Sequence, residues 1–162
     1  MRSKHLALIG AACVALSACL PILTGKPTDH LEAISAIKNF YYHLDVERYS
    51  PESLDGVVSD DFLIFESGQA MNRDQFHEYL SHTDDSADPL SLTRWNQSDF
   101  QTSADKNSIH VTYHNSGRFE HGSSLVVEIE WLESALFIRT SDGLKLKFLN
   151  VNMVSKAINR EL

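Results

Sequence analysis

The chain has 162 residues, of which 43% are hydrophobic and 22% are charged, a composition typical of a globular domain rather than a disordered one. It carries 14 Lys and Arg against 22 Asp and Glu, for a net charge of -8 at pH 7. An acidic chain lacks the basic surface that phosphate backbones and anionic lipids attract, so the composition argues against nucleic acid as a partner and against membrane binding through a basic patch.

The first residues have the pattern of a secretory signal peptide. Arg2 and Lys4 precede a run of apolar and small residues that ends at Cys19. A positive start, a short apolar region and a small-residue cleavage site are typical of such a leader. The run is too short for a permanent transmembrane helix. We therefore predict a signal peptide over 1–18, a tether over 19–28 and a single domain over 29–162.

The segment Leu16-Ser17-Ala18-Cys19 resembles the lipobox of bacterial lipoproteins. The resemblance implies that Cys19 is lipidated, becomes the first residue of the mature chain and anchors it in a membrane. In the sorting rule that accompanies it, an Asp after the cysteine retains the protein at the inner membrane. Here that residue is Leu20, so we expect the outer membrane, facing the periplasm. The alternative is ordinary signal cleavage with an unmodified cysteine.

The first half of the domain shows helical patterns. Asp29 followed by Glu32 predicts the start of a helix, and apolar residues recur every three or four positions as far as Leu44. Ser50-Pro51 predicts a second, short helix. The apolar run 62–66 predicts a strand, and Asn72 with Gln75 predicts the start of a third helix.

From Leu92 onward the apolar period changes to two, which predicts a series of strands joined by tight turns such as 141–143. In the last strand the alternation inverts after Phe148, and we interpret this as a change of environment along the strand. Three helices followed by antiparallel strands predict an α+β fold in which helices cover one face of a curved sheet. The concave side of such a sheet is a favoured place for a ligand.

Three stretches resemble the nuclear transport factor 2-like (NTF2-like) superfamily, in its SnoaL-like and ketosteroid-isomerase-like branch. They are Leu54 to Phe62 after an amphipathic helix, Glu66-Ser67-Gly68 with the helix start at 72–76, and Trp131 to Phe137 followed by 142–146 and the last strand. The resemblance implies a cone-shaped curved antiparallel sheet with three N-terminal helices. It also implies a pocket between the sheet and the helices.

The resemblance also suggests catalytic residues. Ketosteroid isomerases use a carboxylate base, a tyrosine and a protonated aspartic acid. A gap-free match places the base at Glu66 and the tyrosine at Tyr42, whereas the aspartic acid falls on Ala135, which cannot donate a hydrogen bond. Glu133 points to the same face two residues away. Because Glu66 follows an apolar run, we expect its carboxyl to be desolvated and its pKa raised.

A further departure from the family favours binding over proton transfer. Relatives with the Trp-x-Glu-Ser-Ala signature often carry a histidine where this chain has Asn150. An amide can donate and accept hydrogen bonds but does not titrate near neutrality. We expect no metal or other cofactor, because only His110 and His114 of the eight histidines share a strand face at short spacing.

Three hypotheses follow. The first is binding of a small, largely apolar molecule without chemistry, with candidate wall residues and two polar anchors: Phe62, Ile64, Trp95, Tyr113 and Trp131, with Glu66 and Asn150. The second is a cofactor-free isomerase, dehydratase or cyclase with Glu66 as base and Tyr42 as hydrogen-bond donor. The third is a protein-interaction or homodimerisation module using a sheet face opposite the core, predicted to present Val126, Leu132 and Leu149.

Overall fold

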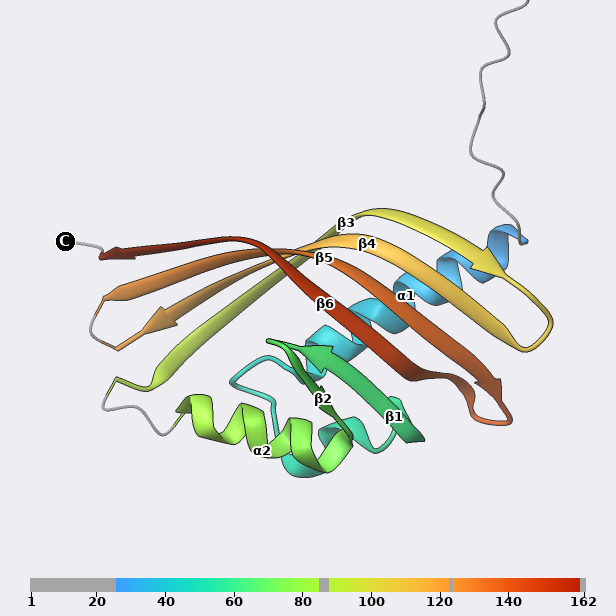
Figure 1. Ribbon diagram of the computed structural model, residues 1–162, viewed down its shortest axis with the longest axis horizontal. Helices are drawn as coiled ribbons and strands as arrows, with labels where there is room; N and C mark the ends of the chain where they lie inside the picture. The colour runs from blue at the N-terminus through green and yellow to red at the C-terminus, as the bar shows by residue number, and fades with distance from the viewer. Residues whose placement is uncertain (1–25, 85–87, 123, 161–162) are drawn as a thin grey trace, which may run out of the picture.

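The computed structural model describes residues 26–84, 88–122 and 124–160 (Figure 1). The predicted signal peptide, Cys19 and most of the predicted tether lie outside these residues. Two helices, one 3-10 turn and six strands follow in this order: α1 Pro27–His43, η1 Pro51–Leu54, β1 Val58–Glu66, β2 Gln69–Met71, α2 Arg73–Asp84, β3 Leu90–Ala104, β4 Ser108–His121, β5 Leu125–Thr140 and β6 Gly143–Arg160. In the part of the chain that the structure describes, no helix is both long enough and apolar enough to span a bilayer.

The six strands form one sheet in the order β2-β1-β6-β5-β4-β3, with both helices on the same side of its curved surface (Figure 1). All neighbouring strands are antiparallel except β1 and β6, which run parallel. The α+β prediction with a curved sheet is confirmed, but the prediction of a purely antiparallel sheet is wrong at this pair. Alternation along a strand identifies its buried face and carries no information about the direction of its neighbour.

The prediction of three helices is also wrong, because the second segment forms only the 3-10 turn Pro51–Leu54. Four residues are too few to offset the nucleation of an α-helix, and the buried Leu54 holds the turn against the core. The start of α2 is as predicted. The Gln75 N–H donates to Asn72 Oδ1 at 2.9 Å, and the Asn72 N–H donates to Gln75 Oε1 at 3.0 Å.

Helix α1 is fixed to the sheet by both apolar packing and ion pairs. Its inner face buries Ile37 and Phe40 completely. At its first turn Asp29 accepts a hydrogen bond from the Lys26 N–H at 3.0 Å, so the N-cap is Lys26, whereas the sequence predicted Asp29. Arg139 of β5 then pairs with Asp29 at 2.7 Å and with Glu32 at 2.9 Å. The helix therefore lies across the concave face in a fixed orientation.

The inverted alternation in the last strand is a β-bulge. Leu136 lies opposite Phe148 and Phe137 lies opposite Leu146, so Lys147 is an extra residue in β6. One inserted residue moves the following side chains to the other face of the strand, as far as a second irregularity at Val154, and sharpens the bend of the sheet. Leu149 consequently faces the core, with 1% of its surface exposed.

The predicted interaction face is wrong at two of its three residues, and the bulge accounts for Leu149. Leu149 belongs to the hydrophobic core, and Val126 is only 2% exposed. Of the three residues expected to lie opposite the core, Leu132 alone is exposed, at 55%.

Candidate functional site

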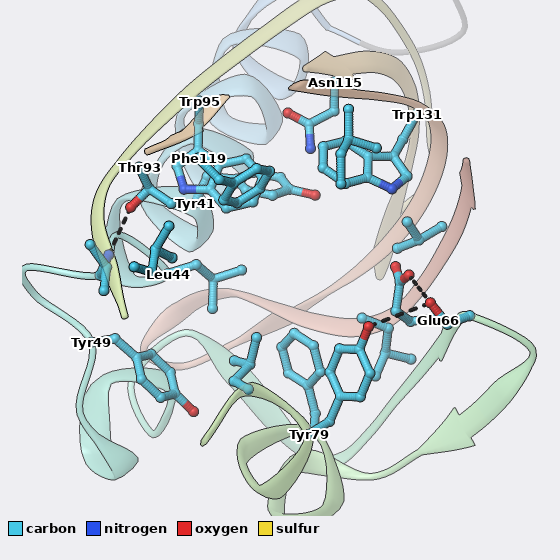
Figure 2. Close-up of a pocket in the computed structure, with 18 of the residues that line it drawn as sticks. Tyr41, Leu44, Tyr49, Glu66, Tyr79, Thr93, Trp95, Asn115, Phe119 and Trp131 are labelled. Atoms are coloured by element: carbon cyan, nitrogen blue, oxygen red, sulfur yellow. Dashed lines mark hydrogen bonds between the residues drawn. The ribbon is translucent and has the colours of Figure 1, made fainter. Parts of the chain in front are cut away.

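A cavity of about 870 Å³ lies between the concave face of the sheet and the elements α1, η1 and α2 (Figure 2). Most of its wall is apolar or aromatic, with side chains contributed by every helix and by five of the six strands. The volume falls within the range of about 300–1,000 Å³ usual for small-molecule sites.

Four aromatic rings from four different elements form one wall of the cavity, and we call them the ring cluster: Tyr41, Trp95, Phe119 and Trp131. Trp95 lies 4.9 Å from Tyr41, 5.2 Å from Phe119 and 6.0 Å from Trp131, measured between ring centroids. Gly117 makes this packing feasible, because a Cβ there would approach Phe119 to 2.7 Å. Both tryptophans of the chain lie in this wall.

Beside the ring cluster, Glu133 of β5 brings a carboxyl group into the deep end of the cavity with only 4% of its surface exposed. The Tyr41 hydroxyl donates a hydrogen bond to its Oε2, and the Asn115 amide donates to its Oε1 at 3.0 Å. Asn115 is itself oriented by Gln97, whose amide donates to its Oδ1 at 3.1 Å. Burial raises the pKa of Glu133, and the hydrogen bonds from its neighbours oppose this effect in part.

Glu66 brings a second carboxyl group into the cavity at the end of β1. Figure 2 shows Glu66 and Tyr79 across the cavity from the ring cluster. Burial raises the pKa of Glu66, while the hydrogen bond donated by the Ser67 hydroxyl at 2.8 Å lowers it. The negative charge of Glu66 also contributes to the raised pKa of Glu133, so the two carboxyl groups influence each other.

Three buried donors have no hydrogen-bond partner among the described residues: the indole nitrogens of Trp95 and Trp131 and the hydroxyl of Tyr113. The Tyr113 hydroxyl is close enough to Glu133 to affect its pKa but does not reach hydrogen-bond geometry. Buried polar groups normally have a partner, so the indole nitrogens of Trp95 and Trp131, which line the cavity, can each take an acceptor atom of a ligand or a water molecule, whereas the Tyr113 hydroxyl lies in the core.

The raised pKa of Glu133 predicts a pH dependence of stability. Between its ordinary value of 4.5 and its raised value, the folded protein keeps a proton that the unfolded chain releases. We therefore expect the stabilisation to be complete below pH 4.5 and to be lost as pH rises through the raised pKa. Urea unfolding at a series of pH values should show this fall, and Glu133→Gln should flatten it. If the free energy of unfolding of Glu133→Gln falls with pH as steeply as that of the wild type, Glu133 is not the group responsible. The raised pKa of Glu66 contributes a fall in the same direction, and Glu66→Gln measures that contribution separately.

The structure brings four of the predicted site residues into the cavity wall: Ile64, Glu66, Trp95 and Trp131. Phe62 and Tyr113 lie in the core instead, Phe62 against Phe76 at 6.3 Å and Tyr113 beside Tyr41 at 6.4 Å between ring centroids.

Tyr42 and Asn150 lie outside the cavity. Tyr42 is 55% exposed, with the Arg48 guanidinium 4.6 Å above its ring. Asn150 lines a separate shallow depression, because its neighbours Leu149 and Val151 face the cavity and successive strand residues point to opposite faces.

Tyr41, Asn115 and Glu133 form the polar end of the cavity, and none of them was selected as a site residue from the sequence. One signal was available for Tyr41. The helical stripe that includes Ile37 and Leu44 places Tyr41 inward and Tyr42 outward, whereas the gap-free family match selected Tyr42. Across residues 26–84, 88–122 and 124–160, no three His, Asp or Glu side chains gather closely enough to hold a metal ion.

Comparison with known proteins identifies the fold but no close relative. No protein-family model and no curated protein matches the sequence. Among solved structures, the Kfla4162 protein from Kribbella flavida superposes with a TM-score of 0.69 at 13% identity, over 80% of this chain and 93% of that one. Hexachlorocyclohexane dehydrochlorinase LinA-type3 from Novosphingobium barchaimii superposes with a TM-score of 0.63 at 11% identity, over 85% and 97%.

An NTF2-like protein from Cytophaga hutchinsonii superposes with a TM-score of 0.61 at 13% identity, over 80% of this chain and all of that one. At such identities the likeness concerns the fold and not the activity. It agrees with the mixed curved sheet, the helices on its concave side and the cavity between them. The chain therefore has the NTF2-like fold.

Proposed function

We propose that this domain binds a small, largely apolar molecule in the cavity without transforming it. The observation that carries the proposal is the cavity itself, about 870 Å³ with a mostly apolar wall and a few polar groups gathered at two places. Apolar walls supply affinity through burial, and a small number of polar groups fixes orientation. The free indole donors of Trp95 and Trp131 favour a ligand with at least one acceptor atom.

A cavity-filling substitution tests this proposal. Val151→Phe adds a ring inside the cavity, while the control Asn152→Phe adds the same ring on the opposite face of β6. We expect Val151→Phe to weaken binding of the neutral apolar probe N-phenyl-1-naphthylamine by about tenfold or more, because overpacking removes the space that it occupies. Both variants are compared in the full chain carrying Cys19→Ser, so that no lipid competes for the probe. Equal affinities in the two variants would refute binding in this cavity.

We also propose that the chain is exported and held at the outer membrane by lipid on Cys19, facing the periplasm. The support is the leader pattern of residues 1–18 with its lipobox-like end. Incorporation of labelled palmitate into the wild-type chain, and its loss in Cys19→Ser, is the expected result. A mature chain that begins at another residue, or one that carries no label, would exclude the anchor.

A second candidate function is cofactor-free acid–base catalysis with Glu66 as the base. It is favoured by one observation: a carboxyl group with a raised pKa faces an apolar cavity that also holds the Tyr41 hydroxyl.

Glu66→Gln separates the two functions, because glutamine retains the shape and hydrogen-bonding capacity of the side chain but cannot accept a proton as a base. For a binding protein we expect a modest loss of affinity and no turnover to lose. For an enzyme, turnover of a carbonyl substrate should fall by about 10²–10⁴-fold with affinity retained.

A further inference from the structure

The charges that face the cavity are mostly negative. Glu66 and Glu133 contribute two carboxyl groups, and the whole chain has a net charge of -8. Within the described part of the chain, Lys156 is the one lysine or arginine that lines the cavity, and it is exposed on the outer half of β6. The two lining histidines are already engaged, His77 with Tyr49 at 2.7 Å and His121 with a backbone carbonyl at 2.8 Å.

Neither carboxyl group has a cationic partner among the described residues. The groups that hydrogen-bond Glu133 are the neutral Tyr41 and Asn115, and Glu66 receives its hydrogen bond from Ser67. Elsewhere the fold does pair acids with cations, as in the contacts of Arg139 with two acids of α1. A carboxylate removed from water without a counter-charge is unfavourable, so these two groups favour a positive charge that enters with the ligand.

The carboxyl group of Glu133 also has unused acceptor capacity. A carboxylate offers about four acceptor positions on its two oxygens. Tyr41 donates to one oxygen and Asn115 to the other. The N–H of a protonated amine can therefore be accepted without displacing either existing hydrogen bond, whereas a quaternary ammonium group would be attracted to the carboxylate by charge alone.

The aromatic walls point to the same ligand chemistry. The faces of tyrosine, tryptophan and phenylalanine rings attract cations that lie within about 6 Å, most strongly where water is excluded. The ring cluster lies on one side of the cavity, and Tyr49 and Tyr79 line the other. The protein already makes such a contact on its surface, where Arg48 lies over Tyr42. A cation that enters with the ligand stabilises the ionised form of both carboxyl groups, whereas an anion is repelled by that form and a neutral molecule leaves burial to favour the protonated form.

We propose that the molecule bound in this cavity is an organic cation, an apolar amine or quaternary ammonium compound held between the carboxyl groups of Glu66 and Glu133 and the ring cluster. This inference rests on the proposed binding function and specifies the charge of its ligand.

Three probes that share a phenyl ring and differ in charge test the inference: benzyltrimethylammonium, benzyl alcohol and benzoate. Trp95 and Trp131 are the only tryptophans of the chain, so intrinsic fluorescence reports directly on the cavity. In the full chain carrying Cys19→Ser, we expect the cation to bind about tenfold more tightly than the alcohol, and the anion to bind least.

Removal of either cavity carboxyl group should narrow this preference. We expect Glu66→Gln to weaken binding of benzyltrimethylammonium by about threefold or more and to leave the affinity for benzyl alcohol unchanged. Glu133→Gln should act in the same direction, and Glu66→Gln keeps the test valid if the more buried variant fails to fold. Glu130→Gln is the matched control, because it removes the same charge from the exposed face of β5.

The outcomes distinguish this inference from the function on which it rests. If benzyl alcohol binds as tightly as the cation, or if Glu130→Gln lowers the preference as much as Glu66→Gln does, the inference is wrong while the binding cavity stands. If none of the three probes changes the fluorescence and N-phenyl-1-naphthylamine also fails to bind, both are wrong. Tighter binding of benzoate would show that the ligand is not a cation, while the binding cavity would stand.

Discussion

Replacement of Leu149 by alanine is expected to lower the free energy of unfolding by about 2–5 kcal/mol, the range typical of a large aliphatic side chain deleted from a packed core. Leu149 is 1% exposed. It follows the bulge at Lys147, which turns its side chain into the core. The neighbouring strands hold their positions, so the lost methyl groups leave a void that collapses only in part. Urea unfolding followed by tryptophan fluorescence measures the change.

Leu132→Ala is the matched control for this experiment. Leu132 lies on β5 and is 55% exposed, so we expect a change within about 0.5 kcal/mol. The sequence pattern alone had placed both leucines on the same outer face, and it would have predicted similar small effects. Equal destabilisation by the two substitutions would contradict the register of β6 against β5.

Tyr41→Phe is expected to lower the free energy of unfolding by about 1.5–3 kcal/mol, because it removes a hydrogen bond to a buried acid. The Tyr41 hydroxyl donates to Glu133, which is 4% exposed and receives its other hydrogen bond from Asn115. Since the hydroxyl lowers the pKa of Glu133, its loss should also raise that pKa further. A carboxyl-carbon NMR titration of wild type and variant measures this second effect.

Tyr42→Phe provides the control at the adjacent position. Its ring is 55% exposed and lies outside the cavity, so the same change of one oxygen atom should leave stability and the pKa of Glu133 unaltered. A destabilisation at Tyr42 equal to that at Tyr41 would show that the helix presents the other face to the sheet.

The comparisons of Leu149 with Leu132 and of Tyr41 with Tyr42 show what the sequence could and could not predict. The strand that leads to Glu66 and the two tryptophans of the cavity were accessible from apolar patterns, because a half-buried strand alternates with a period of two. The phase of α1 was also accessible. The helical pattern places Tyr41 inward, but the gap-free family match selected Tyr42 instead. Such a match is displaced by one residue wherever a single insertion separates the two chains.

Other features depend on long-range geometry that a sequence pattern does not contain. The bulge at Lys147 leaves only an inverted alternation, which has the same appearance as a change of environment. Glu133 was noticed as sharing a face with Ala135, but its partners come from α1 and β4. Those contacts exist only once strands distant in sequence are paired, and for the same reason the direction of β1 beside β6 could not be predicted.

The parallel pairing of β1 and β6 has a consequence for the order in which the protein folds. β1 carries Glu66, and its other neighbour in the sheet is the three-residue β2. Its long neighbour is β6, the last strand of the described domain, so the wall of the cavity that contains Glu66 forms only when the two halves of the domain meet. Contacts between such distant segments slow folding, and we expect completion of the cavity to limit the folding rate.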